Sequence, residues 1–385
     1  TQTVNAIPTG NITGSNTLCP GVPVVLNSNA AAGSGSISTI QWRLGGVNIG
    51  GATNSDYTAT AAGNYDVVIT NSNGCTYTTT PVFTVTASAT LMSGTYYIGR
   101  INAVNVNGST TTLTATSTAN LVVGAVLSKV SGGGTFAANT IVTSIVDATT
   151  FTVNVAPTVA MAGAAIAGLD CDDYPSFVAA IADLNSRTMG GNCLFNVQPG
   201  YVENLTAKMA ALGNAGLNAT AATRTLTFQK NGAGANPKIV AYTGGVGTPT
   251  TAVPDGIFTI SGTDNVTIDG IDLEENAANT TNPSTMEYGY GLFKLSAGDG
   301  VQNATIRNCV ITLNRVNNAA GAGPMLEGSV GILAANSTAT AATSALLPTN
   351  GGTVNTNGTN SNNKFYTNTI QNCNQGIVLS GYLAV

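Results

Sequence analysis

The phrases "NATIRNCVITLNR" (residues 303–315) and "NTIQNCNQGIVLSG" (residues 368–381) each place an isoleucine three residues before a cysteine. Both belong to a wider repeat, in which glycine-led apolar runs begin at Gly256, Gly291, Gly331 and Gly376. The intervals average roughly 40 residues, which is typical of solenoid repeats. Each unit consists of strands and polar turns with no helical segment between them, and this predicts a parallel β-helix.

The repeat also predicts which side chains stack on one another in neighbouring rungs. Rungs lie about 4.8 Å apart, so equivalent residues form columns. Aligning the phrases on their Asn-Cys pairs gives two interior columns: Ile268, Ile306 and Ile370 in one, and Ile271, Cys309 and Cys373 in the other. Cys309 and Cys373 are then stacked core thiols. Their spacing would also permit a disulfide, and we favour buried packing without a bridge.

The composition indicates an all-β protein and excludes several functions. Charged residues make up 8% of the 385 residues, so the surface must be polar through Thr, Asn, Ser and Gly, which favour strands and turns. A net charge of −5 with 12 basic residues offers no electrostatic footprint for nucleic acid. No run approaches the roughly 18 apolar residues of a membrane span. Because histidine is absent, Ser-His-Asp, Cys-His and His-metal sites are excluded.

Residues 1–87 predict a small β-sandwich, because short alternating runs such as "STIQWRL" and "NYDVVITN" are separated by turn-rich stretches. The stretch "ATNSDYTATAAGNYDVVITNSNGC" resembles the Ig-like repeats of large secreted proteins from Bacteroidota-type bacteria. The resemblance implies that Trp42 lies in the core and that Tyr65 occupies the tyrosine-corner position. Cys75 follows Tyr65 later than in antibody domains, so a Cys19–Cys75 disulfide would join strand ends. A spacer role is favoured over ligand binding.

Residues 101–168 alternate apolar and Thr/Asn positions and predict a separate small β-domain. The segments "GTYYIGR" (94–100) and "DYPSFVAAIADLNS" (173–186) flank it. They resemble two halves of an opening phrase that is nearly contiguous in secreted, pectin-lyase-like β-helix proteins of Bacteroidota. The resemblance implies a right-handed parallel β-helix built from residues 88–100 and 169–385, with 101–168 inserted. Surface loops tolerate such insertions because closure entropy grows slowly with length.

A single amphipathic helix is predicted at residues 174–186, with Phe177, Ile181 and Leu184 on its apolar face. Pro175 lies near its first turn, and Asp173 would cap it. Such a helix can cover the open first edge of a β-helix. The cysteines Cys171 and Cys193 bracket the helix, and a disulfide between them would tie this cap to the first strand.

A carbohydrate-active enzyme is the main enzymatic hypothesis. A glycosidase needs two carboxylates that flank the scissile bond, and a lyase needs calcium-binding carboxylates with a basic residue. The best candidates are Asp269, Asp272 and Arg307. The alternative is an ordinary solvated strand face, in which Asp269, Arg307 and Gln371 form an outward column and the ion pair contributes little to stability.

Two further groups suggest ligands. Asp170, Asp172 and Asp173 in "LDCDDY" would suit calcium in a secreted protein, although helix capping and solubility explain them equally well. No other cofactor is predicted. In "MEYGYG", Tyr288 and Tyr290 fall on one side of an extended segment, as a sugar-stacking platform requires. Cross-strand packing is the alternative for the two tyrosines.

These patterns favour a non-enzymatic, extracellular structural or adhesive protein of a bacterial cell surface, with a polysaccharide lyase or glycosidase as the alternative. The expected partners are copies of itself, surface glycans or other cell-surface proteins. The sequence stops within a repeat and has no capping segment, so we expect either further rungs or an open end that stacks on another subunit. Stacking of that kind, or strand addition by the N-terminal segment, would build a filament.

Overall fold

A computed structural model of the chain is nearly all β, which confirms the predicted fold class. In the part of the chain that is described, the two α-helices are Phe177–Ser186 (α1) and Ala215–Ala221 (α2). Neither of these two helices is long and apolar enough to cross a membrane. The structure describes residues 4–19, 23–87, 91–100, 102–119, 121, 123, 125–137, 140–169, 172–245, 254–281, 284–315, 328–340, 349–350, 353–354 and 356–380.

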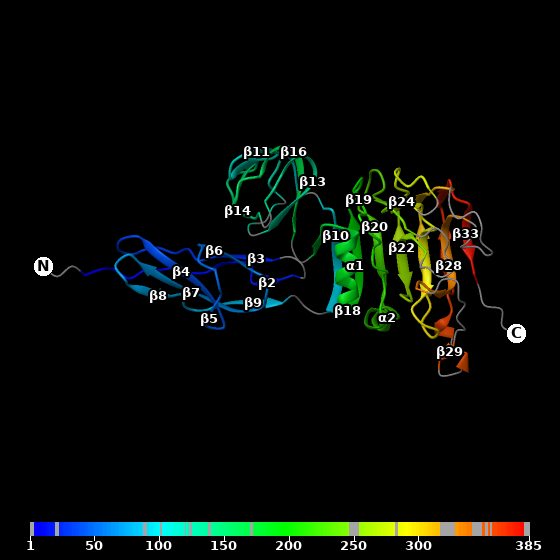
Figure 1. Cartoon of the computed structure of the whole chain (residues 1–385), viewed down its shortest axis with the longest axis horizontal. Coiled ribbons are helices and arrows are strands. Elements are labelled where there is room, and N and C mark those ends of the chain that lie inside the picture. The colour runs from blue at the N-terminus through cyan, green and yellow to red at the C-terminus, as the bar shows by residue number, and fades with distance from the viewer. Residues whose placement is uncertain are drawn as a thin grey trace. The chain divides into compact units, whose positions relative to one another are not determined.

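The chain divides into two compact units, each formed by two separate segments (Figure 1). The first, here called the N-terminal unit, contains Thr1–Ala89 and Ile101–Asp173. The second, here called the coil unit, contains Thr90–Arg100 and Tyr174–Val385.

The first segment of the N-terminal unit contains two sheets that enclose one core. One sheet has the order β1-β3-β6, and the other has the order β2-β9-β7-β4-β5, with β8 paired to β7. Trp42 is fully buried, and the hydroxyl of Tyr65 donates to the carbonyl of Ala61 at 2.7 Å. The strands are β1 Thr13–Gly14, β2 Thr17–Leu18, β3 Val24–Asn27, β4 Ile37–Leu44, β5 Val47–Asn48, β6 Asp56–Ala59, β7 Gly63–Asn71, β8 Thr76–Thr78 and β9 Phe83–Ala87.

The second segment of this unit forms an antiparallel sheet with its own core, which includes Leu113, Phe151 and Ile166. The strand order is β13-β16-β11-β12-β15-β14. A bridge between Val126 and Ile141 joins the first strand of this order to the start of the last, so the sheet closes on itself. The strands are β11 Ala103–Gly108, β12 Thr112–Thr114, β13 Val126–Thr135, β14 Val142–Ile145, β15 Thr150–Val153 and β16 Val159–Leu169.

The coil unit winds through three parallel sheets in a fixed order, and each turn forms one rung (Figure 1). The first sheet has the order β17-β10-β18-β20-β23-β26-β31, the second β19-β21-β24-β27-β32, and the third β22-β25-β28-β33. The chain thus visits the three sheets in turn four times from β20 to β33, with β29 and β30 forming a hairpin outside them. We call this three-sided arrangement the coil.

The coil strands are short, as expected where each rung turns three corners. In the first sheet they are β10 Leu91–Ile98, β17 Asp173–Tyr174, β18 Thr188–Val197, β20 Leu226–Lys230, β23 Val266–Asp269, β26 Thr305–Arg307 and β31 Lys364–Tyr366. The second and third sheets contain β19 Val202–Asn204, β21 Lys238–Val240, β24 Asp272–Glu274, β27 Val310–Thr312 and β32 Thr369–Gln371, then β22 Gly256–Ser261, β25 Tyr288–Lys294, β28 Val330–Thr338 and β33 Gln375–Leu379. The hairpin strands are β29 Thr349–Asn350 and β30 Thr353–Val354.

The predicted stacking is correct for one pair of rungs and wrong for the next. Ile268 pairs with Ile306, and both Ile271 and Cys309 are buried. In the following rung, however, Ile306 pairs with Phe365, while Ile370 pairs with Ile311. Gln371 accordingly lies beside Thr312 and not beside Arg307. The alignment on Asn-Cys pairs is therefore shifted in the last rung.

The shift has a conformational cause. Asn308 and Asn372 both adopt the left-handed backbone conformation, with φ of 58° and 55°. Asn308 follows a strand of the first sheet, whereas Asn372 follows a strand of the second. Asparagine is one of the few residues that tolerates this conformation, so it recurs at corners. The repeated Asn-Cys phrase marks two different corners of the coil, and Cys309 and Cys373 are not stacked. Both are free thiols, as favoured.

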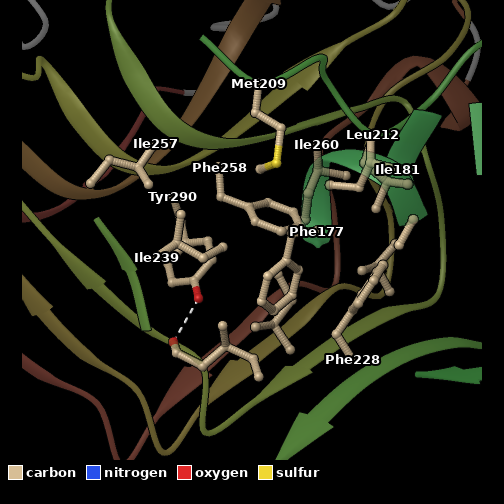
Figure 2. Packing of buried hydrophobic residues seen from close by; sticks show 14 of the residues in the cluster. Phe177, Ile181, Met209, Leu212, Phe228, Ile239, Ile257, Phe258, Ile260 and Tyr290 are labelled. Carbon is tan, nitrogen blue, oxygen red and sulfur yellow. Dashed lines mark hydrogen bonds between the residues drawn. The ribbon is translucent and has the colours of Figure 1, made fainter. Parts of the chain in front are cut away.

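The helix α1 covers the interior at the first rungs, as predicted. Phe177, Ile181 and Leu184 are fully buried, and Figure 2 shows the ring of Phe177 among core side chains. Phe177 packs against Phe228 and Phe258, with ring centroids 6.0 and 6.4 Å away. The predicted cap is wrong: Ser176 is the N-cap, and its hydroxyl accepts the amide of Ala179 at 3.0 Å. Ser176 rather than Asp173 directly precedes the first helical residue.

Candidate functional site

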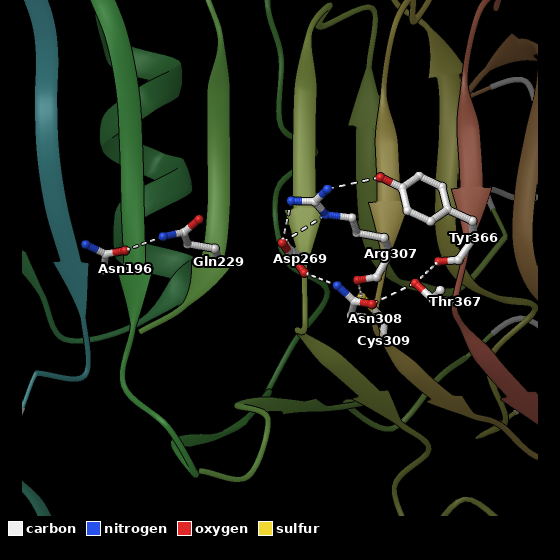
Figure 3. Close-up of polar contacts among 8 residues, drawn as sticks. All are labelled: Asn196, Gln229, Asp269, Arg307, Asn308, Cys309, Tyr366 and Thr367. Atoms are coloured by element: carbon white, nitrogen blue, oxygen red, sulfur yellow. Dashed lines mark hydrogen bonds and ion pairs between the residues drawn. The ribbon is translucent and has the colours of Figure 1, made fainter. Parts of the chain in front are cut away.

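A column of polar side chains crosses the outer face of the first sheet (Figure 3). Strand register places the residues of five consecutive strands side by side. We call this set the polar column: Asn196, Gln229, Asp269, Arg307 and Tyr366. It forms because each strand alternates inward apolar residues with outward polar ones, as in Thr267-Ile268-Asp269.

Hydrogen bonds join the members of the polar column into two separate groups, Asn196 with Gln229 and Asp269 with Arg307 and Tyr366, as Figure 3 shows. The Gln229 amide donates to Asn196 Oδ1 at 3.0 Å. Arg307 Nη2 lies 2.7 Å from Asp269 Oδ2, and Asn308 donates to Asp269 Oδ1 at 2.6 Å. Both oxygens of Asp269 are therefore engaged.

Arg307 also connects Asp269 to the tyrosine at the end of the column. Its Nη1 donates to the hydroxyl of Tyr366 at 3.0 Å. The hydrogen bonds to Tyr366 and Asp269 raise the pKa of the Arg307 guanidinium, so it stays charged. The phenol ring of Tyr366 is held at its hydroxyl end while 44% of the residue remains exposed.

A second outward column runs parallel to the polar column along the same strands. It contains Thr227, Thr267, Thr305 and Lys364, and we call it the threonine column. The three threonines are partly buried and Lys364 is exposed. Within the described part of the chain, none of these four side chains makes a hydrogen bond or an ion pair. The threonine column thus presents polar groups that are open to a ligand.

The three predicted catalytic residues do not converge on one site. Asp269 and Arg307 form the expected ion pair, but Asp272 belongs to the second sheet, beyond the corner at Gly270. Its Oδ1 accepts the amide of Asn236 at 2.8 Å and the backbone N–H of Val310 at 2.7 Å. Asp272 therefore ties neighbouring rungs together.

The predicted sugar platform is wrong, because Tyr288 and Tyr290 are 1% and 0% exposed. The Tyr290 hydroxyl donates to the carbonyl of Ile271 at 2.7 Å inside the coil. Tyr288 lies in a different cluster, where its ring packs against Phe293 with centroids 5.4 Å apart. The third-sheet strands β22 and β25 are buried on both faces, so their outward residues pack rather than bind.

The remaining predicted sites are also corrected. Cys75 and Cys193 are free thiols, so neither the Cys19–Cys75 nor the Cys171–Cys193 disulfide forms. Two cysteines that flank a strand or a helix in the sequence can form a disulfide only if their Cβ atoms point toward each other, and sequence position does not determine that direction. For calcium, Asp170 and Cys171 lie outside the described residues, Asp172 is exposed and Asp173 is buried. Across the described residues, no group of three or more Cys, Asp or Glu is arranged to hold a metal ion.

The sequence interpretation missed a buried pair of carboxyl groups at the start of the third sheet. Asp255 Oδ1 accepts the hydroxyl of Tyr242 at 2.7 Å, and its Oδ2 accepts the backbone N–H of Gly245 at 2.8 Å. Glu287 is 1% exposed and accepts the backbone N–H of Asp255 through Oε2. Among the residues that the structure describes, its Oε1 has no hydrogen-bond partner.

The pKa of Glu287 is raised to about 8, chiefly by burial; the nearby Asp255 charge also raises this pKa, whereas the hydrogen bond from the Asp255 backbone and the charge of Lys208 lower it. Lys208 lies at the same end of the strand, and its ammonium donates to the carbonyl of Pro254 at 2.7 Å. A signal for the pair was present in the sequence. Asp255 and Glu287 each directly precede a third-sheet strand, and those strands pair Gly256 with Tyr288.

Comparison with known proteins adds no assignment: no protein-family model matches the chain, and no curated protein matches it. The function must therefore be argued from the arrangement of side chains. Of the two arrangements, the outer face of the first sheet is open to solvent, whereas the Asp255–Glu287 pair is enclosed.

Proposed function

We propose that this protein is a non-enzymatic structural or adhesive protein that acts outside a bacterial cell, and that the coil presents its binding face. The observation that carries the proposal is the pair of outward columns on the first sheet. A rigid scaffold holds a row of polar side chains at regular intervals, and the side chains of the threonine column make no hydrogen bond with other described residues. Binding sites placed on rigid elements are more precise than sites on loops.

The environment of the acidic residues supports binding over catalysis. A glycosidase places two carboxylates on either side of the scissile bond, with a separation of roughly 5–10 Å and free access to the sugar. Asp269 has both oxygens occupied by Arg307 and Asn308, and Asp272 faces outward from another sheet. The two carboxylates therefore do not face each other across a common site.

The proposal is tested by incubating the purified chain with bacterial cell envelopes and with extracellular polysaccharide. We expect the chain to be retained on this material without release of reducing or unsaturated sugars. Sugar release that Asp269→Ala or Asp272→Ala abolishes would instead support a carbohydrate-active enzyme. A chain that is neither retained nor active would contradict both functions.

A further inference from the structure

We propose that Cys19 and Cys171 form a disulfide that closes the N-terminal unit into one covalent ring. This cross-link goes beyond the proposed function, because it does not depend on any ligand of the coil. Three observations carry the inference: the state of Cys19, the state of the other cysteines, and the places of the two residues along the chain.

The first observation is the state of Cys19, which directly follows strand β2. Its sulfur belongs to a disulfide and therefore does not titrate as a thiol. The residue is 9% exposed, so its sulfur is poorly accessible to an attacking thiolate. Exposed disulfides are the labile, regulatory or catalytic ones, whereas sheltered disulfides resist reduction. The burial of Cys19 thus favours a structural cross-link.

The second observation identifies the partner by elimination. The chain contains six cysteines. Four of them are free thiols, namely Cys75, Cys193, Cys309 and Cys373. The one cysteine of the sequence that remains is Cys171, which lies outside the described residues. A disulfide between Cys19 and another cysteine of the same chain must therefore involve Cys171.

The third observation is where the two cysteines lie along the chain. Both belong to the N-terminal unit. Strand β2 pairs with β9 so that Leu18 lies beside Ala87, and Cys19 therefore comes at the end of β9, where the chain leaves for the coil unit. Cys171 comes between the end of β16 and the start of β17, where the chain returns to the coil unit. Each cysteine thus lies next to one of the passages between the units.

The cross-link would enclose most of the N-terminal unit in one ring. The ring contains strands β3 to β9 of the first segment and strands β11 to β16 of the second. It also contains β10, which pairs with β18 in the coil unit. A loop of about 150 residues is a long one, and in the chain-entropy model long loops gain the most stability from closure. The disulfide therefore holds the two segments of the N-terminal unit together even when one of them opens.

The bond forms by thiol–disulfide exchange with a disulfide oxidant. One cysteine thiolate attacks the oxidant's disulfide and forms a mixed disulfide, and the second thiolate then displaces the oxidant. Two protons and two electrons leave the two thiols, and the oxidant departs as a dithiol. Disulfide oxidoreductases of this class act outside the bacterial cytosol. The extracellular setting of the proposed function supplies this condition.

The test counts the thiols of the full chain after export to the bacterial periplasm. The purified chain is denatured in iodoacetamide, and its intact mass is measured before and after reduction. We expect four alkylated cysteines without reductant and six after reduction. A protease digest without reductant should contain a peptide that links Cys19 to Cys171, and mass spectrometry with fragmentation identifies the pair.

Matched variants then measure what the cross-link does. Reductant should lower the unfolding temperature of the wild type by about 5 °C or more, because the unfolded chain is no longer restricted. Cys19→Ser and Cys171→Ser should both unfold at the temperature of the reduced wild type and should not respond to reductant. Cys75→Ser removes a free thiol and serves as the control. It should keep the linked peptide and the full response to reductant.

The outcomes are independent of the binding experiment. Six alkylated cysteines without reductant, a linked peptide with a different pair, or a disulfide-linked dimer would each overturn the inference. An equal response of the wild type and Cys19→Ser to reductant would overturn the stabilising role of the ring. Retention on cell envelopes by a chain without the disulfide would leave the proposed function standing, and a cross-linked chain that is not retained would contradict that function alone.

Discussion

The outer faces of the first and third sheets show that one winding of the chain can produce two opposite surfaces. Both sheets belong to the same coil and have the same parallel pairing. On the first sheet the outward residues are polar and partly exposed, as in Thr267 and Asp269. On the third sheet Tyr288, Phe293 and Leu333 form a buried cluster. Backbone winding alone therefore does not determine which face is available for binding.

The difference arises from the pattern within each strand. First-sheet strands alternate strictly, so one face is apolar and the other polar, as expected for a sheet with one solvated side. Third-sheet strands such as "GIFTIS" and "YGYGLFK" are nearly continuous runs of apolar or small residues, and every residue in them is buried. Such runs are typical of strands buried on both faces.

The largest expected effect is the cost of truncating the outer face of the third sheet. Phe293→Ala should reduce the free energy of unfolding by about 3–5 kcal/mol, because Phe293 is fully buried and packs against Tyr288. Thr267→Ala on the first sheet should change it by about 0.5 kcal/mol or less. Denaturant unfolding monitored by circular dichroism measures both. Equal effects would show that the two outer faces are not different.

The second effect is a pH dependence of the free energy of unfolding, which arises from Glu287 beside the third sheet. Burial raises the pKa of Glu287 from 4.5 to about 8. A group whose pKa is raised on folding gives its full stability below the unfolded value and loses it as pH rises through the folded value. The free energy of unfolding should therefore fall as pH rises from 4.5 to 8, by about 1.4 kcal/mol per pH unit at most.

The pKa values of Glu203 and Glu275 are also raised, so these residues add to the pH dependence of stability. The isosteric variant Glu287→Gln isolates the contribution of Glu287. The difference in unfolding free energy between Glu287→Gln and the wild type should grow in favour of the variant from pH 5 to pH 8. Asp269→Asn on the first sheet serves as the control and should show no such growth. Parallel pH profiles for Glu287→Gln and the wild type would contradict the assignment.

Much of the fold could be predicted from the sequence because local patterns decide it. Alternation in "TIDG" and "TIRN" fixed the pairing of Ile268 with Ile306 and of Asp269 with Arg307. The spacing of Phe177, Ile181 and Leu184 predicted the helix and its buried face. In each case a short period determines which side of the element faces the core.

The rest depended on information that is not local. Asn-Cys recurs at two corners because Asn308 and Asn372 share a backbone conformation, and composition cannot tell one corner from another. Tyr290 is buried inside the coil and Tyr288 in a separate cluster with Phe293, and alternation within "MEYGYG" does not distinguish these two environments. Disulfide pairing was unpredictable for the same reason, since it needs the relative placement of separate strands.

The third effect concerns the corner that follows each first-sheet strand. Gly270, Asn308 and Thr367 have positive φ of 67°, 58° and 53°. A β-branched residue is strained in this conformation, whereas asparagine tolerates it. Thr367→Asn should therefore stabilise the coil by about 1 kcal/mol, and Asn308→Thr should destabilise it by a similar amount. Thermal unfolding compares the two. A loss of stability in Thr367→Asn would show that the hydrogen bond from Thr367 to Asn308 outweighs the strain.

The smallest effect is expected from the ion pair on the proposed binding face. Arg307 and Asp269 are partly exposed, so their attraction is screened by water and their pairing costs side-chain entropy. A double-mutant cycle with Asp269→Asn and Arg307→Gln should give a coupling energy of about 0.2–1 kcal/mol, which should fall as salt is added. A coupling above about 2 kcal/mol would mean that the pair is a structural element of the coil. A small value would show that Asp269 and Arg307 belong to an ordinary solvated strand face, in contrast to the buried side chains on the outer face of the third sheet.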